Sequence, residues 1–127
     1  MPDPVVVAEV LDLIAASGRL LDTGEFEAWS RLWTVDGQFR VFGQVMTGQA
    51  ELQAFGELSP KGVHVAGLPG ITEQDGEVRA TTSFVFVNSQ DPVPSAGYYR
   101  DTFVRVDGRL LFSVRAVRVH TEPGATP

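Results

Sequence analysis

The side chains in this sequence that could move protons are few, and they lie far apart along the chain. The 127 residues include two histidines and no cysteine. An imidazole can gain or lose a proton near neutral pH, which makes His64 the first candidate for a general acid or base. Without cysteine the chain has no disulfide, no thiolate nucleophile and no cysteine-ligated metal. The remaining question is which carboxylates and hydroxyls the fold could bring near His64.

Asp101 is the second candidate, because strand periodicity places it among apolar side chains. A two-residue turn at Asp107-Gly108 is a strong hairpin signal, and a regular register from it defines one face rich in aromatic groups. That face carries Tyr99, Asp101, Phe103, Leu110, Phe112, Val114 and Ala116. Burying a carboxylate there is costly unless it has a partner. Asp101 is therefore either a functional group beside Tyr99 or a structural aspartate paired with a neighbour.

The same register assigns the other polar groups of the last strand. It places Arg118 on the face of Asp101 and Arg115 on the opposite face, where we expect a solvated surface charge. His120 is expected at the surface. The two histidines lie 56 residues apart without a His-x-His or His-Glu-x-x-His pattern, so we expect no metal and no cofactor.

One irregularity decides where His64 points. In a regular hairpin around Asp75-Gly76, the imidazole would face solvent. The stretch Gly67-Leu68-Pro69-Gly70 suits a bulge, and a single bulge reverses the alternation of side chains. We expect an irregularity between Gly67 and Ile71. His64 would then lie across from Asn88 and share the face of the aromatic residues Phe84 and Phe86.

The apolar pattern predicts helices first and strands afterwards. Residues 4–21 show the three- and four-residue spacing of an amphipathic helix. Asp22-Thr23-Gly24-Glu25 has the pattern of a capping box, with Asp22 as N-cap of a second helix that Asp36-Gly37 ends. A strand or short hairpin is expected at 38–46, and a short helix capped by Thr47 follows. Long strands are expected at 62–73, 77–88, 97–106 and 109–120.

This order indicates one α+β domain over residues 1–127, with 121–127 as a frayed tail. Long antiparallel strands coil, and a coiled sheet wrapped on helices forms a cone with a hollow inside. Aromatic side chains would form most of the wall of that hollow. The candidates for substrate binding are Asn88, Trp29, Trp33, Phe42, Phe55, Phe84, Phe86, Phe103 and Phe112.

Several short segments, in this order and spacing, resemble the SnoaL-like branch of the nuclear transport factor 2-like superfamily, with its scytalone dehydratase and ketosteroid isomerase type of cone. The segments are Leu21-Asp22-Thr23-Gly24-Glu25-Phe26, Leu32-Trp33-Thr34-Val35-Asp36-Gly37, Gly62-Val63-His64-Val65, Tyr99-Arg100-Asp101 and Val104-Arg105-Val106-Asp107-Gly108-Arg109-Leu110. The resemblance covers roughly residues 5–120. It implies N-terminal helices on a strongly curved, mainly antiparallel sheet with an internal pocket. This fold hosts dehydratases, isomerases, cyclases, epoxide hydrolases and non-enzymes, so it does not by itself choose a reaction.

The resemblance also implies roles for single residues. Similar proteins often have a histidine at the position of His64, pointing into the pocket as a general acid or base. Asp22 matches an aspartate that dehydratases place at the end of the first helix, but Ser17 stands where they have a tyrosine. The helix N-cap is the alternative role for Asp22. Arg100 and Asp101 are adjacent and face opposite ways, unlike the arginine between two aspartates of the epoxide hydrolases.

We therefore expect a cofactor-independent acid/base enzyme of the dehydratase, isomerase or cyclase type, acting on a small, largely apolar organic molecule. His64 would move the proton. Asp101 and Tyr99 would orient the histidine or hold a substrate oxygen, and Asp22 is the fourth catalytic candidate. The alternative is a non-catalytic module of the same fold that binds a small molecule, dimerises or docks on a larger enzyme.

Charge and hydropathy argue against other partners. The formal net charge is −6, and no basic patch is dense enough to neutralise a row of phosphates, so a nucleic-acid partner is not expected. No apolar run reaches membrane-spanning length, and the first residues lack the basic region of a signal peptide. We expect a cytoplasmic protein without membrane contact.

The face of the sheet that carries no helix predicts a homodimer. We expect that face to carry Val104, Leu111 and Val117 beside Arg100 and Arg115, and exposed apolar area of this kind is typical of an interface. Light scattering at micromolar concentration should then give about twice the chain mass of 13.8 kDa. A mass near that of one chain would rule the dimer out.

Overall fold

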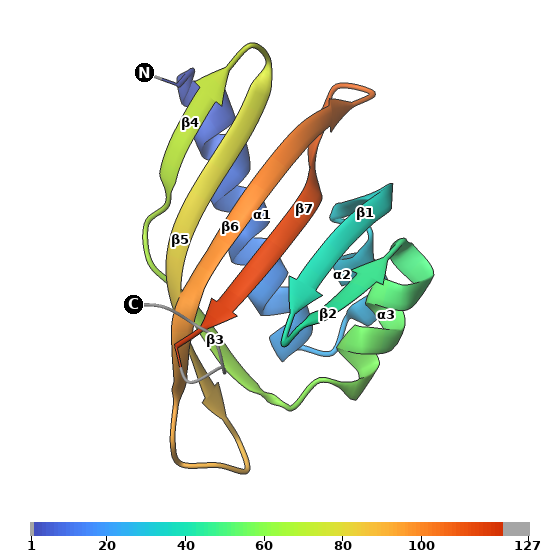
Figure 1. The fold of residues 1–127 in the computed structure, drawn as a ribbon, viewed down its shortest axis with the longest axis vertical. Coiled ribbons are helices and arrows are strands. Elements are labelled where there is room, and N and C mark those ends of the chain that lie inside the picture. The colour runs from blue at the N-terminus through green and yellow to red at the C-terminus, as the bar shows by residue number, and fades with distance from the viewer. Residues whose placement is uncertain (1, 121–127) are drawn as a thin grey trace.

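The computed structural model describes residues 2–120 and arranges them as helices packed on one curved sheet (Figure 1). The helices are α1 (Pro4–Asp22), α2 (Phe26–Ser30) and α3 (Gln49–Leu58). The strands are β1 (Trp33–Val41), β2 (Gln44–Thr47), β3 (Gly62–Ala66), β4 (Gly70–Gln74), β5 (Glu77–Asn88), β6 (Ser95–Val106) and β7 (Arg109–Val119). The predicted α+β class is confirmed, and the tail expected at 121–127 lies outside the described residues. No helix within 2–120 is both long and apolar enough to cross a membrane.

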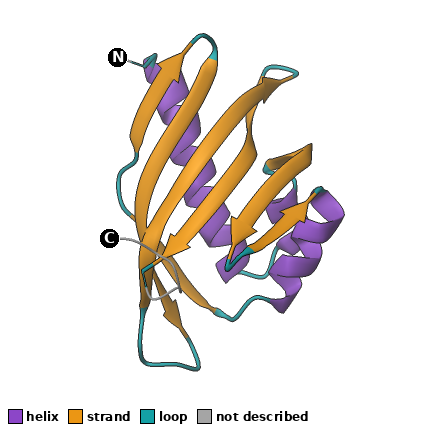
Figure 2. Cartoon of the chain, in the orientation of Figure 1, coloured by secondary structure: helices purple, strands orange, loops and turns teal. Residues whose placement is uncertain are grey.

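The sheet forms one layer, and α1 packs diagonally across one of its faces (Figures 1 and 2). The strand order is β2-β1-β7-β6-β5-β3, with β4 also paired to β5. Only β1 and β7 run parallel, and the other pairs are antiparallel. The helices α2 and α3 lie at the β1–β2 end. The face of the sheet that α1 packs against is called the covered face, and the hollow lies on this side.

The strand expected at 62–73 is two strands, because the chain leaves the ladder between them. In β4, Gly70 lies opposite Thr81, whereas in β3 His64 lies opposite Phe86. These registers differ by one residue, so the predicted irregularity is confirmed, and His64 and Phe86 share a face. The prediction that His64 lies across from Asn88 is wrong. The extra residue lies in the segment between β3 and β4. It shifts the partner of His64 toward the start of β5, to Phe86, rather than toward its end.

A second one-residue shift divides the hairpin of β6 and β7. Near the turn, Phe103 lies opposite Phe112 as predicted, but beyond the shift Asp101 lies opposite Arg115. Arg115 is only 3% exposed, so the prediction of a solvated charge is wrong. Arg118 is exposed instead of sharing the face of Asp101, because the extra residue reverses the alternation of the far half of β7.

The segment after α1 differs from the prediction. α2 ends at Ser30, and Trp33 already begins β1, so Asp36-Gly37 lies in a strand and ends no helix. Asp22 is the last residue of α1, and Glu25 takes the N-cap position of α2 without a side-chain cap bond. The N-cap interpretation of Asp22 is therefore wrong. α3 begins after Gly48 rather than after a threonine cap.

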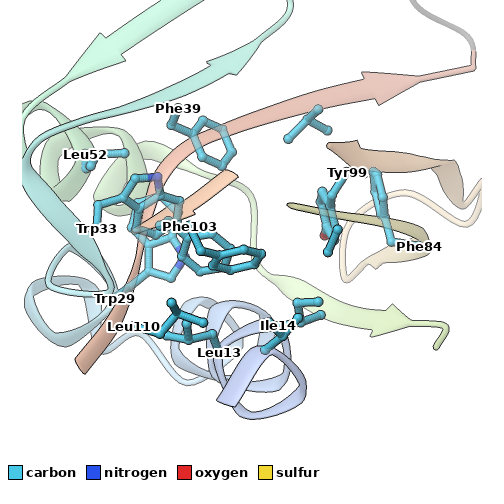
Figure 3. Close-up of a cluster of buried hydrophobic side chains, with 14 of the residues drawn as sticks. Leu13, Ile14, Trp29, Trp33, Phe39, Leu52, Phe84, Tyr99, Phe103 and Leu110 are labelled. Carbon is cyan, nitrogen blue, oxygen red and sulfur yellow. The ribbon is translucent and has the colours of Figure 1, made fainter. Parts of the chain in front are cut away.

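A cluster of large aromatic side chains joins α2 to the β1–β7 part of the sheet (Figure 3). The rings of Trp29 and Trp33 lie 4.8 Å apart, and both residues are buried. Phe112 stacks on Trp33 at 4.8 Å, and Phe103 contacts Phe112 at 4.9 Å. Burial of each such side chain stabilises the fold by roughly 1.5–3 kcal/mol. This cluster stabilises the parallel pairing of β1 with β7, two strands that no short turn connects.

The bare face of the sheet differs from the prediction at two positions. Arg115 and Val117 are buried on the helix-covered face, so they cannot contribute to a surface between protomers. Val104 is exposed and Leu111 is half-buried. Further exposed valines pair across β3 and β5 on this bare face, namely Val63 with Val87 and Val65 with Val85. The homodimer stays a prediction, and these valines are its strongest contact candidates.

Gly97 allows a close approach of β7 to β6. A Cβ on Gly97 would lie 1.8 Å from the carbonyl oxygen of Arg118, whereas a Cβ on Gly67 would have its nearest contact, the Ser83 oxygen, at 3.6 Å. We predict that Gly97→Ala lowers the free energy of unfolding by at least about 1–3 kcal/mol, since backbone atoms must move. The matched Gly67→Ala should stay within about 1 kcal/mol of the parent. Urea unfolding measures both, and equal stabilities would contradict this close approach.

Candidate active site

The inner pocket is a hollow of about 190 Å³ between α1, α3 and the covered face of the sheet. Its wall is mainly aromatic and aliphatic and includes Trp29, Phe39, Phe55, Phe84, Phe86 and Val117. Polar groups interrupt this wall, notably at Ser17, His64, Asn88, Tyr99 and Arg115. An apolar pocket with a few convergent polar groups is the usual form of a small-molecule site.

A second hollow, the outer groove, has a volume of about 690 Å³ and lies between α1 and the β3–β4 segment. Residues of α1 from Leu11 to Asp22 form one wall, and residues 64–69 form the other. Ser17, His64 and Tyr99 line both hollows. These three residues are called the boundary below, because a group there can reach a ligand in either hollow.

The carboxylate of Asp22 holds His64 at two points. Its Oδ1 lies 2.6 Å from Nδ1 of the imidazole, and its Oδ2 accepts the backbone N–H of His64 at 3.0 Å. An ionised carboxylate can only accept, so we assign the ring proton to Nδ1, which leaves Nε2 as an acceptor. The two side chains are 20% and 18% exposed. The Asp22–His64 pair, called the dyad below, is thus shielded from bulk water but accessible from the hollows.

Two further contacts restrict the imidazole ring. Phe86 packs against it, with ring centroids 4.5 Å apart. Gly18 of α1 lies so close to β3 that a Cβ there would be 3.1 Å from Cβ of His64. The end of α1 can approach the strand because position 18 has no side chain. Packing and hydrogen bonding together hold the ring in one orientation, as proton transfer requires.

An ion pair lies deeper, between two residues that are each 3% exposed. Arg115 donates from Nε to Oδ1 of Asp101 at 2.7 Å and from Nη2 to Oδ2 at 2.9 Å. Its Nη1 donates to Oγ of Ser17 at 2.8 Å. Burial raises the pKa of Asp101, while the charge and hydrogen bonds of Arg115 oppose that shift. Asp101 has the partner that a buried carboxylate needs, and that partner ties β6 to β7 and, through Ser17, to α1.

Tyr99 connects this ion pair to the boundary. Its ring stacks on Phe84 with centroids 4.4 Å apart and planes 6° apart (Figure 3). The guanidinium of Arg115 lies over the Tyr99 ring, with its carbon 3.8 Å from the ring centroid. Burial raises the pKa of Tyr99, with the charge of Arg115 opposing the shift. The phenol therefore stays protonated at neutral pH and can donate a hydrogen bond.

The structure separates the predicted site residues by position. The inner pocket is lined by His64, Tyr99, Asn88, Trp29, Phe42, Phe55, Phe84 and Phe86, and the outer groove by Asp22. Trp33, Phe103 and Phe112 were predicted to bind substrate, but they are 0% exposed and line neither hollow, because they fill the core. Asp101 lines neither hollow, and its carboxylate contacts Arg115 instead of His64.

The inward positions of Arg115 and Ser17 at the site were not predicted from the sequence. A signal for Arg115 was present in the alternation of the last strand. Apolar residues occupy even positions near the turn and odd positions farther on, as Leu110, Phe112, Val117 and Val119 show. That change requires a one-residue shift between the two halves, and the shift turns Arg115 inward. For Ser17 there was no comparable signal, since its role depends on a partner 98 residues away.

The groups that meet at the boundary are an imidazole, a phenol and a hydroxyl, with a carboxylate behind the imidazole. The hydroxyl of Ser17 is already engaged, because it donates to the carbonyl oxygen of Ile14 and accepts from Arg115. The imidazole can transfer a proton, and the phenol can donate a hydrogen bond to an oxygen of a ligand. Within residues 2–120, no three His, Asp or Glu side chains gather into a group that could hold a metal ion.

A family model described as the SnoaL-like domain matches residues 6–116. The chain belongs to this family. The resemblance inferred from the short sequence segments is therefore confirmed, as is the cone fold that it implied. No curated protein sequence matches this SnoaL-like chain significantly.

Solved structures share the fold over nearly the whole SnoaL-like domain. A protein from Catenulispora acidiphila in complex with S-DNPA is 26% identical, with a TM-score of 0.78 over 95% of this chain and 98% of that one. An NTF2-like protein with a cystatin-like fold from Novosphingobium aromaticivorans is 24% identical, with a TM-score of 0.80 over 88% and 80%. A candidate scytalone dehydratase from the same species is 18% identical, with a TM-score of 0.76 over 91% and 84%.

The buried pair of Asp101 and Arg115 should be strongly coupled. Removing one partner leaves the other charge buried and unpaired, so we predict that Asp101→Asn or Arg115→Gln alone lowers the free energy of unfolding by about 3–5 kcal/mol. The double variant should lose clearly less than the sum of the two, because it leaves no unpaired charge. Urea unfolding of the four proteins measures this coupling. Losses that simply add would contradict it.

Proposed function

We propose that this SnoaL-like protein is a cofactor-independent acid/base enzyme of the dehydratase, isomerase or cyclase type, whose substrate is a small, largely apolar organic molecule. The observation that carries the proposal is the two-point hold of Asp22 on His64 at the boundary of the inner pocket. A histidine whose Nδ1 is held by a carboxylate, with Nε2 left for a ligand, is arranged for proton transfer.

In this proposal His64 moves the proton through Nε2. The neutral imidazole accepts a proton from the substrate, and the carboxylate of Asp22, 2.6 Å from Nδ1, stabilises the imidazolium that forms. The imidazolium then gives the proton to a leaving oxygen or to another carbon, as elimination, isomerisation or ring closure requires. The aromatic wall of the pocket excludes water, which strengthens each of these polar interactions.

Tyr99 would hold a substrate oxygen during the same step. Its phenol stays protonated at neutral pH, and it lines both hollows beside His64. A hydrogen bond from it would stabilise negative charge that develops on a carbonyl or hydroxyl oxygen. Arg115 holds the Tyr99 ring from one side, and Asp101 acts only through Arg115. We therefore assign Asp101 a positioning role rather than direct contact with the substrate.

The relatives support a small organic molecule in the pocket. The Catenulispora acidiphila protein has the same fold at 26% identity, and its structure contains S-DNPA. The more distant Novosphingobium aromaticivorans protein carries the name of a dehydratase. A dehydratase is a lyase, so this name is consistent with the proposed reaction class.

A non-catalytic binding module of the same fold is the second candidate. The observation that favours it is Ser17, which stands where similar dehydratases have a tyrosine and whose hydroxyl accepts a hydrogen bond from Arg115. One proton-donating group expected of a dehydratase is thereby absent from the site. Such a module would bind the same class of molecule and leave it unchanged.

Substitution of the dyad tests the proposed function. We predict that His64→Gln reduces turnover of hydroxylated or enone-bearing cyclic substrates by at least about a hundredfold, since positioned acid–base catalysis contributes 10²–10⁴-fold. Asp22→Asn should reduce turnover by about tenfold or more, because the ring loses its orientation and the imidazolium loses its counter-charge. Chromatographic assay of product formation, together with thermal unfolding of each variant, measures both effects.

The matched control is His120→Gln, at an exposed histidine that lines neither hollow. It should keep the activity of the parent. Unchanged turnover by a folded His64→Gln protein would show that another group moves the proton. Saturable binding of panel compounds without any conversion by the parent would favour the binding module.

A further inference from the structure

The inner pocket alone is small for a ligand site. Its volume of about 190 Å³ lies below the roughly 300–1,000 Å³ that ligand pockets usually have. The outer groove adds about 690 Å³ and shares the boundary residues with the pocket. A ligand of ordinary size that contacts His64 needs space beyond the inner pocket, and the outer groove is a hollow that also borders His64.

The walls of the groove offer apolar surface to a ligand. Leu68 is 89% exposed and Leu11 is 39% exposed, so both offer apolar surface that is not covered within the described fold. Pro69 and Ala15 continue these walls. Exposed apolar surface along a groove is typical of a binding site.

Arg19 gives the groove a positive charge that forms no ion pair with a described residue. Its guanidinium makes no ion pair or hydrogen bond with any residue in 2–120. The carboxylate of Asp22 also lines the groove and keeps its negative charge, but its oxygens accept two N–H groups of His64 and make no ion pair with Arg19. The inner pocket differs, because its guanidinium at Arg115 is paired with Asp101.

Helix geometry sets the distance between this charge and the dyad. Leu11, Ala15 and Arg19 follow each other at four-residue spacing, so they form one stripe of α1 along the groove. Arg19 precedes Asp22 by three residues, or about 4.5 Å along the helix axis. A ligand whose ring contacts His64 could therefore reach Arg19 with an arm of a few atoms.

We propose that the outer groove is a second binding subsite, in which Arg19 pairs with a negatively charged arm of the substrate. The ligand class is an aromatic or polycyclic body, held in the inner pocket, with a short chain that ends in a carboxylate. The inference rests on the proposed function only for the reaction at His64. The subsite itself is defined by binding and is tested without turnover.

The test compares two probes that differ only in the end group of the arm, 3-(2-naphthyl)propanoic acid and 3-(2-naphthyl)propan-1-ol. Binding to the parent and to Arg19→Gln is measured by isothermal calorimetry at low salt. We expect the parent to bind the acid about three- to fivefold more tightly than the alcohol, the range of a solvent-accessible ion pair. Arg19→Gln should remove this preference and leave the affinity for the alcohol unchanged. High salt should weaken the preference in the parent.

The matched control is Arg109→Gln, an equal change of charge at an exposed arginine that lines neither hollow. It should keep the preference for the acid. Intermolecular nuclear Overhauser effects should connect the naphthyl protons to the rings of Phe84 and Tyr99, and the chain protons to Leu68. The subsite is overturned if the parent binds both probes equally or neither one, if Arg19→Gln keeps the preference, or if the chain contacts Phe42 instead of Leu68.

The two proposals can fail separately. His64→Gln should lose turnover and keep the preference for the acid, because Arg19 is unchanged. If the preference is absent while His64→Gln loses turnover, only the subsite is wrong. If the preference is present while His64→Gln keeps full turnover, only the assignment of the proton-transferring residue is wrong.

Discussion

The alternation of side chains along β-strands is the constraint on which this site depends. A one-residue shift moves every later side chain to the other face. The sheet contains such a shift between β3 and β4, and another within the β6–β7 pair. The first turns His64 to the covered face, and the second does the same for Arg115. Without them, the imidazole and the guanidinium would both lie in solvent, and Asp101 would be buried without a partner.

Asp22 shows how one side chain can serve the fold and the site together. It ends α1, accepts the backbone N–H of β3 at His64, and holds the imidazole of the same residue. Because both contacts involve one carboxylate, the position of the helix end and the orientation of the ring cannot vary independently. Gly18 permits this close approach, one turn earlier on the same helix. The precision of the dyad is thus a property of helix–strand packing rather than of a flexible loop.

The fold was largely predictable from the sequence, because its strongest signals are local. The Asp75-Gly76 and Asp107-Gly108 turns adopt positive φ values at both residues, as two-residue hairpins require, and they fix the long hairpins. The helix at 4–21 followed from its apolar spacing. The second helix was overestimated because Trp33 continues the helical spacing of Phe26 and Trp29, although it enters the same core from a strand.

The site was less predictable, because its pairings are long-range. The residues that suit a bulge led to the correct prediction that His64 points inward. Its partner Asp22 is 42 residues away and was interpreted as a helix cap. Residues 22–25 match the capping pattern. Asp22 instead contacts the backbone of a strand, and the position of that strand beside the helix could not be predicted from the sequence. Likewise, the apolar face predicted that Asp101 needs a partner. Identifying Arg115 as that partner required a comparison of the two halves of β7.

The parallel pairing of β1 with β7 has a consequence for the order in which the molecule assembles. Phe39 pairs with Arg115, so this contact closes a loop of about 76 residues, whereas the β4–β5 and β6–β7 hairpins each close over two residues. Contacts between distant segments form slowly, and they tend to form after local ones. The wall that Phe39 and Val41 give to the inner pocket is then among the last parts to form. Substitutions in that wall would mainly accelerate unfolding and leave the folding rate nearly unchanged, which makes it a region where the pocket can vary without impeding the folding of the chain.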